Sequence, residues 1–586
     1  MQLENIEELI KEDTFYKTHG KKYTDKVKYL SKVLIEGETG SGKYKVIPFE
    51  AGIGKSRKTD MIISEYLNNL GNRKFLIVKR FNNEAIATAN HINSNSILGD
   101  SIALAITSEN WKILKQNPKV LLKYTVLIIS HSRYVRLAGE DIHDRQFFTK
   151  DRHTMVIDEA LHMPIYSFTE KKYLEILNLL PFSLHPLFVK ACEGLFHYLT
   201  INKSLLKAKK RSHEIMVFKP KLDKGELAEF KIKFLEKEGI LETQKREDVK
   251  DFVRGLELFY ANTCIFNNNR ISTYDRGLTR WGLANNIILD ANGMLDKRYE
   301  YDPKIEVNRQ TKIIDHSTTN FTQIIFNTST YNIKKTNGKY NKKIAELISS
   351  SQKDEDKTLI VTNLKLKDKL ERELSEYDIL GKVEVSYFGN IVGKNEWREF
   401  NKVWILATPH LPMEHYTIMW SMATGQEFHN RFRMDYYAKK GKMAFVKSEF
   451  EEIRQGYLAG EIYQAIKRIN RDNSHEAAVF VINSDGDVIE RVINELKGVK
   501  VNSPVELEVE SESISRPAKT SKTEELVRYL LSLSQGEYPK KEISSKVDID
   551  KSNFSKYLKS DEVKSLIKEG LIEIKQKSIK RLYPDY

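Results

Sequence analysis

Apolar residues follow two spacings along most of the chain, and each spacing predicts a different kind of element. Short runs of consecutive apolar residues, as in residues 74–79 (KFLIVK), 126–130 (VLIIS) and 153–158 (HTMVID), are typical of strands buried on both faces. Segments between such runs, as in residues 56–70, repeat apolar residues at helical spacing. Strands that alternate with helices predict an α/β fold, in which parallel sheets carry helices on both faces.

Changes in this pattern predict five parts. They are an N-terminal helical segment (1–30), a first α/β lobe (31–335), a second α/β lobe (340–497), a linker (498–523) and a small domain of three helices and a two-stranded hairpin (524–586). Within the first lobe, residues from about 166 to 284 carry helical periodicity, so we expect a helical insertion there. The insertion either contacts nucleic acid or only packs on the lobe.

Charge points to a polyanionic partner. The 586 residues carry a formal net charge of +14, with a pI near 9.1, which is typical of proteins that bind nucleic acid. A proteome rich in lysine would give the same balance.

The two cysteines, Cys192 and Cys264, are too few for a zinc finger, an iron–sulfur site or a disulfide framework. The sequence lacks a long apolar run and a signal-peptide core at its N-terminus, so we expect a cytoplasmic protein.

Two glycine-rich segments near the start could bind phosphate. Residues 37–43 (GETGSGK) and residues 51–56 (AGIGKS) both end in the Gly-Lys pair of a phosphate-binding loop. The first is followed by Tyr44 and by a β-type run with Pro48, which excludes a helix. We therefore expect a hairpin turn there, between strands at residues 32–36 and 44–48.

The second segment has the surroundings that a phosphate loop needs. It follows a predicted strand, precedes a predicted helix and places Ser56 directly after Lys55. Gly52 and Gly54 would shape the loop, Lys55 would reach the β- and γ-phosphates of ATP, and Ser56 would ligate Mg²⁺. Phe49 stands where the longer consensus has glycine.

An acidic pair supplies the second half of an ATP site. The apolar run before it ends at Asp158 and Glu159, so both carboxylates would lie at the end of a buried strand. Asp158 would hold Mg²⁺ and Glu159 would polarise the attacking water. The alternative is an Asp-Glu pair that caps the following helix.

A third motif lies far along the chain, at residues 460–472 (GEIYQAIKRINRD). Gln464, Arg468 and Arg471 are spaced so that, on a helix, they share one face. One arginine there would act as an arginine finger on the leaving phosphate. The alternative is a solvated basic helix face.

Together and in this order, the three motifs resemble those of superfamily 2 helicases of the DEAD/DEAH-like kind. Lys467 and Asn470 depart from the family, which usually has glycine there, so Arg471 is a better match than Arg468. The resemblance implies two tandem RecA-like lobes, with ATP and Mg²⁺ in the cleft between them.

Weaker motifs also fall in the order of that family, and the resemblance implies nucleic-acid contacts for them. These candidates are Arg80, Ser132, Arg133, Gly393 and Asn395. Either residues 290–292 (DAN) or residues 328–330 (TST) would form the motif that links ATP hydrolysis to strand movement.

The tail resembles a winged helix-turn-helix. Ser552, Asn553 and Ser555 would lie near the tip of a recognition helix. Lys556, Lys575 and Lys577 would face backbone phosphates. The alternative is a winged helix that contacts only protein.

These observations favour an ATP-dependent helicase or translocase that acts on DNA, with single strands on the lobes and duplex on the tail. The alternatives are a double-stranded DNA translocase without unwinding, an RNA helicase, or a sequence-specific DNA-binding regulator switched by ATP. By analogy, its partners would be proteins of replication or of mobile elements.

Overall fold

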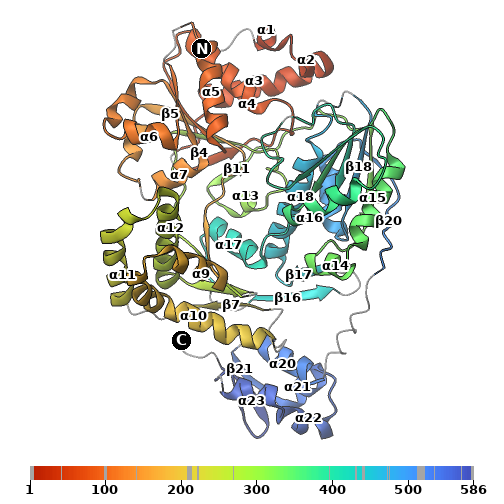
Figure 1. Cartoon of the computed structure of the whole chain (residues 1–586). Helices are drawn as coiled ribbons and strands as arrows, with labels where there is room; N and C mark the ends of the chain where they lie inside the picture. The colour runs from red at the N-terminus through yellow and green to blue at the C-terminus, as the bar shows by residue number, and fades with distance from the viewer. Residues whose placement is uncertain are drawn as a thin grey trace.

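Two parallel sheets form the two lobes of the molecule (Figure 1). This arrangement confirms the predicted α/β fold with two tandem parallel-sheet lobes. The computed structural model describes residues 6–40, 42–97, 102–139, 141–207, 214–220, 224–267, 269–394, 396–428, 432–437, 442–471, 473, 475–510, 522–533, 535–568 and 570–582. None of the helices within these ranges has the length and apolar character needed to cross a membrane.

The first sheet has the strand order β11-β1-β10-β5-β2-β4-β3, and all its neighbours pair in parallel. Because β10 lies between β1 and β5, the chain returns to this sheet after the insertion. The strands are β1 (Tyr44–Val46), β2 (Lys74–Lys79), β3 (Ala103–Ile106), β4 (Val126–Ser130), β5 (Arg152–Asp158), β10 (Asn285–Leu289) and β11 (Ile305–Val307).

Helices cover both faces of this sheet, which explains its continuous apolar runs. In β2, Phe75 and Ile77 join the core cluster on one face, while Leu76 and Val78 join the cluster on the other. The first face is covered by α3 (Lys21–Glu36), α4 (Lys55–Asn68) and α5 (Asn82–Ser94), and the second by α6 (Ser108–Leu114), α7 (His131–Ala138) and α8 (Arg145–Thr149).

The predicted hairpin at residues 32–48 is wrong, because its first strand is the end of helix α3. Tyr23, Val27, Leu30 and Leu34 are buried at helical spacing, and this apolar stripe carries the helix through Glu36. The helix therefore also runs past the expected boundary at residue 30. Shorter helices precede it at α1 (Ile6–Ile10) and α2 (Thr14–His19).

The second sheet has the order β14-β13-β15-β18-β12-β19, with β20 also paired to β12, and it too is parallel. Its strands are β12 (Thr319–Ile325), β13 (Lys357–Thr362), β14 (Lys382–Tyr387), β15 (Lys402–Ile405), β18 (Ala477–Ile482), β19 (Lys500–Val501) and β20 (Val505–Glu506). The helices around it are α14 (Thr330–Lys335), α15 (Lys339–Ser351), α16 (Leu364–Leu374), α18 (Ser448–Ile466) and α19 (Gly486–Glu495).

Two expected boundaries of this lobe differ from the structure. β12 precedes residue 335 but lies in the second sheet, beside β18, so the second lobe begins before residue 319. β19 and β20 fall within the expected linker and pair with β12. Both differences depend on pairing between segments far apart in the sequence, which local composition does not report.

The insertion is not purely helical, because it also contains an antiparallel sheet. That sheet has the order β17-β16-β7-β8-β9-β6, and its strands are β6 (Ile165–Phe168), β7 (Glu214–Phe218), β8 (Cys264–Asn267) and β9 (Arg270–Tyr274) from the insertion, with β16 (Phe432–Tyr437) and β17 (Lys442–Phe445) from the second lobe. Helices α9 (Glu170–Leu179), α10 (His185–Lys207), α11 (Lys224–Lys237) and α12 (Thr243–Ala261) pack with it. Because β7 pairs with β16, the insertion is joined to both lobes.

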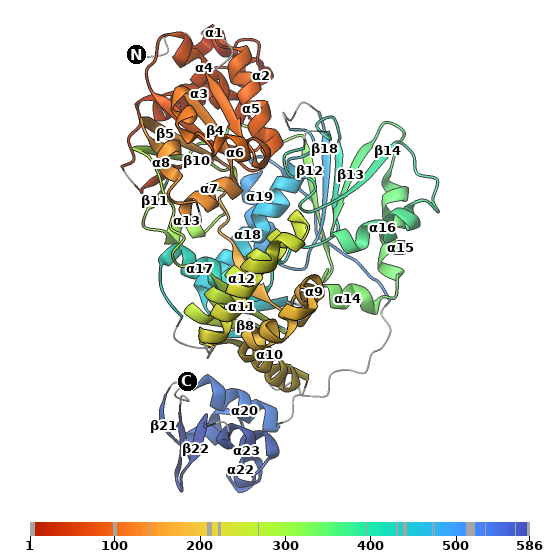
Figure 2. The same cartoon turned by 60° about the vertical axis from the view of Figure 1, so that its left-hand side comes forward.

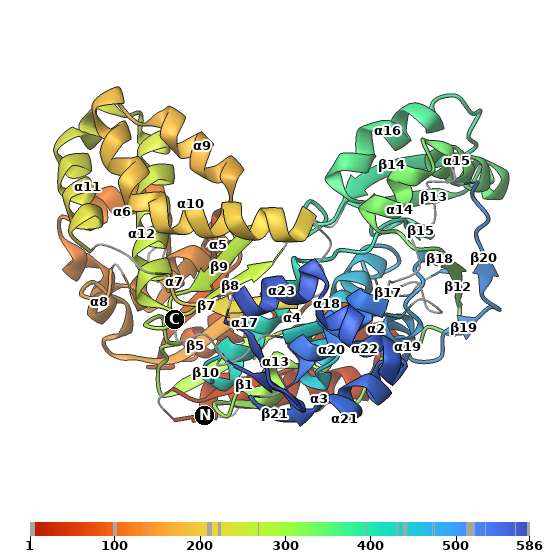
Figure 3. The same ribbon diagram turned by 90° about the horizontal axis from the view of Figure 1, so that it is seen from below.

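Further contacts join the insertion to α17 (Met413–Thr424) of the second lobe, which lies near the centre of the molecule (Figure 1). The Tyr274 hydroxyl lies 2.7 Å from the Ser421 hydroxyl, and Arg270 lies 3.9 Å from Glu414. Seen from below, the insertion helices and helices α14 to α16 lie on opposite sides of the molecule (Figure 3).

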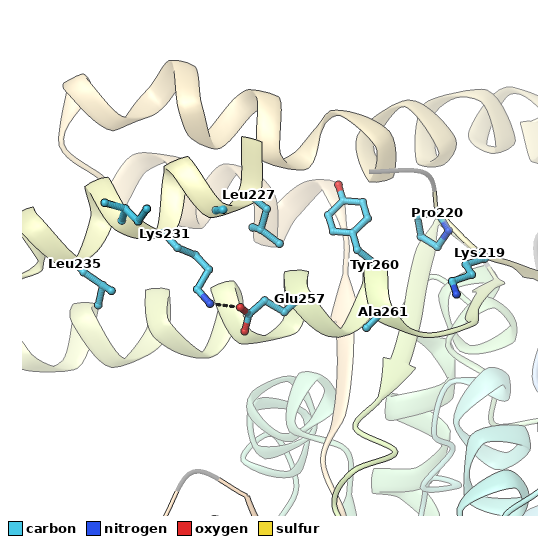
Figure 4. A pocket seen from close by; sticks show the side chains of 10 residues that line it. Lys219, Pro220, Leu227, Lys231, Leu235, Glu257, Tyr260 and Ala261 are labelled. Atoms are coloured by element: carbon cyan, nitrogen blue, oxygen red, sulfur yellow. Dashed lines mark hydrogen bonds and ion pairs between the residues drawn. The ribbon is translucent and has the colours of Figure 1, made fainter. Parts of the chain in front are cut away.

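A groove of about 880 Å³ runs along the insertion, between α11 and α12. Apolar side chains such as Leu227 and Leu235 line it, and Lys231 pairs with Glu257 across it (Figure 4). The groove therefore belongs to the insertion and not to the region between the lobes.

The tail forms a separate small domain with its own apolar core (Figure 2). It consists of α20 (Lys522–Ser532), β21 (Gly536–Pro539), α21 (Lys540–Lys546), α22 (Lys551–Leu558), α23 (Asp561–Lys568), β22 (Ile572–Ile574) and β23 (Ser578–Arg581). The predicted third helix is divided at residues 559–560, and β21 adds a strand beside the predicted hairpin, in the antiparallel order β21-β23-β22.

Candidate nucleotide site between the lobes

The second glycine-rich segment lies between β1 and the start of α4. Gly52 and Gly54 have φ values of +98° and +80°, a region that side chains with a Cβ rarely adopt. Lys55 begins the helix, and its Nζ donates hydrogen bonds to the carbonyl oxygens of Phe49 (2.9 Å) and Glu50 (3.3 Å). Burial lowers the pKa of Lys55. The loop thus has the backbone shape and the position expected of a phosphate-binding loop.

Asp158, at the end of β5, connects this loop to the acidic pair. The Ser56 hydroxyl donates to Asp158 Oδ2 (2.6 Å), and Lys79 Nζ donates to the same oxygen (2.9 Å). Although burial alone would raise the pKa of Asp158, the charge of Lys79 and the bond from Ser56 lower it below its ordinary value. Asp158 is therefore held as a carboxylate next to the loop.

Glu159 follows in a strained conformation. Its φ of +67° is unusual for a residue with a side chain, and its N–H donates to the carbonyl oxygen of Leu289 (3.1 Å). Its carboxylate accepts a hydrogen bond from Arg80 Nη1 (3.1 Å). Arg80, which we expected to contact nucleic acid, thus lies against the acidic pair; the nucleic-acid contact stays a prediction.

Buried contacts with α3 and with the connection between the lobes hold the loop in place. Glu50 accepts hydrogen bonds from the backbone N–H groups of Ile313 (2.5 Å) and Ile314 (3.1 Å), which lead into the second lobe. Its other oxygen lies 3.4 Å from Lys26 of α3, and both side chains are almost fully buried. The Tyr23 hydroxyl donates to the carbonyl oxygen of Ile53 (3.3 Å). The N-terminal helices and the connection between the lobes therefore both position the loop.

The second lobe closes over this loop. A Cβ built on Gly52 would lie 2.9 Å from the carbonyl oxygen of Arg471. The N–H of Ala51 donates to the Tyr463 hydroxyl of α18 (3.4 Å). Arg468 donates from Nη1 to the carbonyl oxygen of Lys394 (3.3 Å). Burial lowers the pKa of Arg468, and the charge of Glu159 acts against this shift. The structure thus brings the backbone of Arg471 to the loop, and it places Arg468 where the charge of Glu159 acts on it.

The sequence predicts that the three residues of the third motif share one helix, and this prediction is wrong. α18 ends at Ile466, so Gln464 is helical while Arg468 and Arg471 lie in the turns that follow. Asn470, with a φ of +37°, redirects the chain between the arginines. Gln464 is half-buried.

Residues 290–292 lie in this cleft, whereas residues 328–330 lie in the second lobe after β12. Asp290 follows β10, and burial raises its pKa to about 6. A Cβ built on Gly460 of α18 would lie 2.9 Å from Asn292. The placement favours residues 290–292 for the linking motif.

The other nucleic-acid candidates on the lobes have different surroundings. Ser132 is exposed on α7, but Arg133 is only 6% exposed, pairs with Asp141 (2.7 Å) and stacks on Trp111. Arg133 thus has partners within the first lobe, and its nucleic-acid contact stays a prediction. Gly393 has a φ of +74°, and a Cβ there would lie 2.6 Å from Glu84 of the first lobe, so this glycine faces the cleft. Asn395 lies outside the described residues.

The candidates on the tail are exposed. Ser552, Asn553, Ser555 and Lys556 lie on α22, where the Ser552 hydroxyl donates to Asp550 (2.6 Å). Lys575 and Lys577 lie at the turn between β22 and β23, and Lys575 pairs with Glu537 (2.6 Å). All six remain candidates for contacts with a partner.

The cleft contains further groups that the sequence did not single out. Lys79 is the clearest, because its position as the last residue of an apolar strand could have indicated a site residue. Glu50 and Tyr463 gave no such signal, since their contacts are with segments far away in the sequence.

The groups around the loop fit Mg²⁺ and a nucleotide. Ser56 and Asp158 offer oxygen atoms, the ligands that Mg²⁺ prefers, and these atoms lie side by side. Gly52 and Gly54 adopt positive φ values that residues with a Cβ rarely adopt, and this gives the tight turn that a phosphate-binding loop needs. Lys55, Arg468 and Arg471 supply positive charge on both sides.

No family model and no curated protein sequence matches the chain. Among solved structures, it is similar to S. tokodaii Xpd4, with 13% identity, a TM-score of 0.49 and coverage of 82% of this chain and 99% of that one. It is also similar to S. cerevisiae Dbp5 bound to RNA and ADP BeF3 (9% identity, 84% and 95% coverage, TM-score 0.35). A DEAD box protein from the hyperthermophile Methanococcus jannaschii gives 10% identity, 83% and 97% coverage and a TM-score of 0.28. At these identities and TM-scores, the function proposed below rests on the residues of the cleft.

Proposed function

We propose that the chain is a DNA helicase or translocase of superfamily 2 type that couples ATP hydrolysis to movement on DNA. The observation that carries this proposal is the pairing of two half-sites. In the first lobe, Ser56 of the phosphate loop contacts Asp158, and in the second lobe Arg471 packs on Gly52.

The residues of the first lobe would bind and activate the substrate. Lys55 would exchange the carbonyl oxygens of Phe49 and Glu50 for phosphate oxygens. Ser56 and Asp158 would hold Mg²⁺, which neutralises charge on the β- and γ-phosphates when bound. Glu159 would accept a proton from the attacking water.

The residues of the second lobe would make hydrolysis depend on closure. Arg468 and Arg471 would stabilise charge on the γ-phosphate only while the lobes are together. Loss of phosphate would weaken this contact and let the lobes separate. Repeated closing and opening would move a strand that both lobes hold.

The choice of DNA is supported by the net charge of +14 and by the exposed lysines of the tail. Within its described residues, the tail has four helices and a three-stranded antiparallel sheet, a combination that suits a winged helix on duplex DNA. There are two competing possibilities. The substrate would be RNA, or the protein would move on duplex DNA without unwinding it.

The decisive measurement is ATP hydrolysis with no nucleic acid, single-stranded DNA, duplex DNA or RNA. We expect single-stranded DNA of any sequence to stimulate turnover most. Stimulation by RNA alone would make the chain an RNA motor, and stimulation by one duplex sequence alone would make it an ATP-switched regulator. An absence of turnover under all four conditions would refute the proposal.

A further inference from the structure

We propose that Arg80 is a positioning residue that couples nucleic-acid binding to the catalytic carboxylate. In the absence of nucleic acid, the Arg80 guanidinium is hydrogen-bonded to the Glu159 carboxylate. A backbone phosphate of the bound strand would replace Glu159 as the partner of Arg80, and the free carboxylate could then contact the attacking water. This inference rests on the proposed function, and it assigns a mechanism by which a bound strand would accelerate hydrolysis.

Two consecutive cations hold two consecutive carboxylates at this point. Lys79 binds Asp158 and Arg80 binds Glu159, at 2.9 and 3.1 Å. The Lys79 side chain is only 4% exposed, whereas those of Arg80 and Glu159 are 32% and 30% exposed. The first pair is therefore fixed within the protein, and the second is within reach of a ligand.

The chemistry of Arg80 suits an exchange of partners. A guanidinium has five N–H donors, and its planar shape binds a phosphate through two parallel hydrogen bonds. Glu159 engages one donor nitrogen, Nη1. Partly exposed ion pairs are weak, so a phosphate that binds through two hydrogen bonds is able to replace the carboxylate.

The turn that carries Arg80 also offers an aromatic surface. Phe81 is 41% exposed, and the Arg80 guanidinium lies 5.6 Å from the centre of its ring. An exposed ring next to a cation is the combination that binds single strands, by stacking on a base beside a phosphate. The turn joins β2 to α5, so it lies at the carboxyl end of the sheet together with Asp158.

Release of Glu159 would change its side chain and not its backbone. The strained φ of +67° and the bond from its N–H to Leu289 fix the backbone of Glu159. Arg80 therefore controls where the carboxylate points. From the second lobe, Arg468 and Arg471 also interact electrostatically with Glu159.

A double-mutant cycle tests the exchange without ATP. The full chain, free of nucleotide, is titrated onto a fluorescent single-stranded thymidine oligonucleotide as wild type, Glu159→Gln, Arg80→Ala and the double variant. We expect Glu159→Gln to tighten binding by about three- to fivefold, as the loss of one competing exposed ion pair allows. In the Arg80→Ala background, the same substitution leaves the affinity unchanged. An equal gain in both backgrounds, or no gain in either, overturns the proposal.

ATP turnover provides the second readout. Arg80→Ala raises turnover in the absence of nucleic acid and abolishes further stimulation, while Arg80→Lys, which keeps the charge but not the fork, restores part of the stimulation. Arg372→Ala, on the exposed side of α16, is the matched control and behaves as the wild type. Arg80→Ala with unchanged or lower basal turnover and full stimulation overturns the proposal. If the wild type hydrolyses no ATP, the proposed function fails, and the binding cycle still decides whether Arg80 exchanges partners.

Discussion

At the scale of single residues, the cleft is organised by side chains that already have internal partners. Lys55 rests on loop carbonyls and Ser56 rests on Asp158. The carbonyl partners of Lys55 are neutral, so phosphate oxygens, which form shorter and stronger hydrogen bonds with a cation, would replace them. These side chains are thus held in position by contacts within the protein.

The two lysines of the glycine-rich segments give the first prediction. Lys55→Ala should lower ATP turnover by about 100-fold or more, since it removes a charged group aimed at the transferred phosphate. Lys43→Ala should have almost no effect, because Lys43 lies in the turn before β1. Steady-state ATP hydrolysis measures both. A dead Lys43→Ala together with an active Lys55→Ala would reverse the assignment of the loop.

Glu159→Gln gives the second prediction. The amide keeps the size of the side chain but accepts no proton, so turnover should fall by about 10²-fold or more. Nucleotide binding should persist, because Lys55, Ser56 and Asp158 are intact. Retention of radiolabelled ATP on the filter-bound protein, compared with Lys55→Ala, checks both parts. Loss of ATP binding in this variant would give Glu159 a structural role instead.

At the scale of elements, helix α18 carries the contact between the lobes. Leu295, from the segment after β10, lies within the core cluster of the second lobe. Gly456 and Gly460 allow that segment to approach α18, since a Cβ on Gly456 would lie 2.1 Å from the Leu295 carbonyl oxygen. The first lobe therefore bears directly on the helix that leads to the arginines.

Gly456→Ala should separate these two elements. A backbone carbonyl cannot move aside as a flexible side chain does, and overpacking of this kind costs about 1–3 kcal/mol. We expect at least a tenfold fall in ATP turnover with little change in nucleotide binding to the first lobe. Gly486→Ala, in α19 with no neighbour within 4 Å of its Cβ, is the control. Normal turnover of Gly456→Ala would show that the contact does not transmit closure.

The sequence predicted those elements whose signal is local. The glycine turn before α4, the position of Asp158 at the end of β5 and the parallel strands all follow from patterns within a dozen residues. The helix through Leu34 was missed because its last turn also resembles a strand. The position of β12 and the pairing of β7 with β16 could not be predicted, since they depend on partners far along the chain. The burial of Arg133 and its pairing with Asp141 could not be predicted either, since both depend on tertiary contacts.

At the scale of the whole molecule, the described residues of the tail form a core of their own. Its core consists of its own residues, such as Leu526, Ile543 and Ile579. Removal of residues 511–586 should therefore leave basal ATP hydrolysis intact while weakening duplex DNA binding and flattening its dependence on salt. Fluorescence anisotropy at several salt concentrations measures the change. Unchanged duplex binding would favour a tail that contacts protein.

The antiparallel sheet joined by β7 and β16 has a consequence for how the protein is made. During synthesis, β7 leaves the ribosome long before β16 has been made. Until then, the backbone groups on the edge of β7 that pairs with β16 have no partner strand. A truncated product that stops before residue 432 would keep that edge open and would tend to aggregate. The insertion and the second lobe are thus parts of one folding unit, and a fragment that contains only the first lobe and its insertion is an unsuitable target for separate expression.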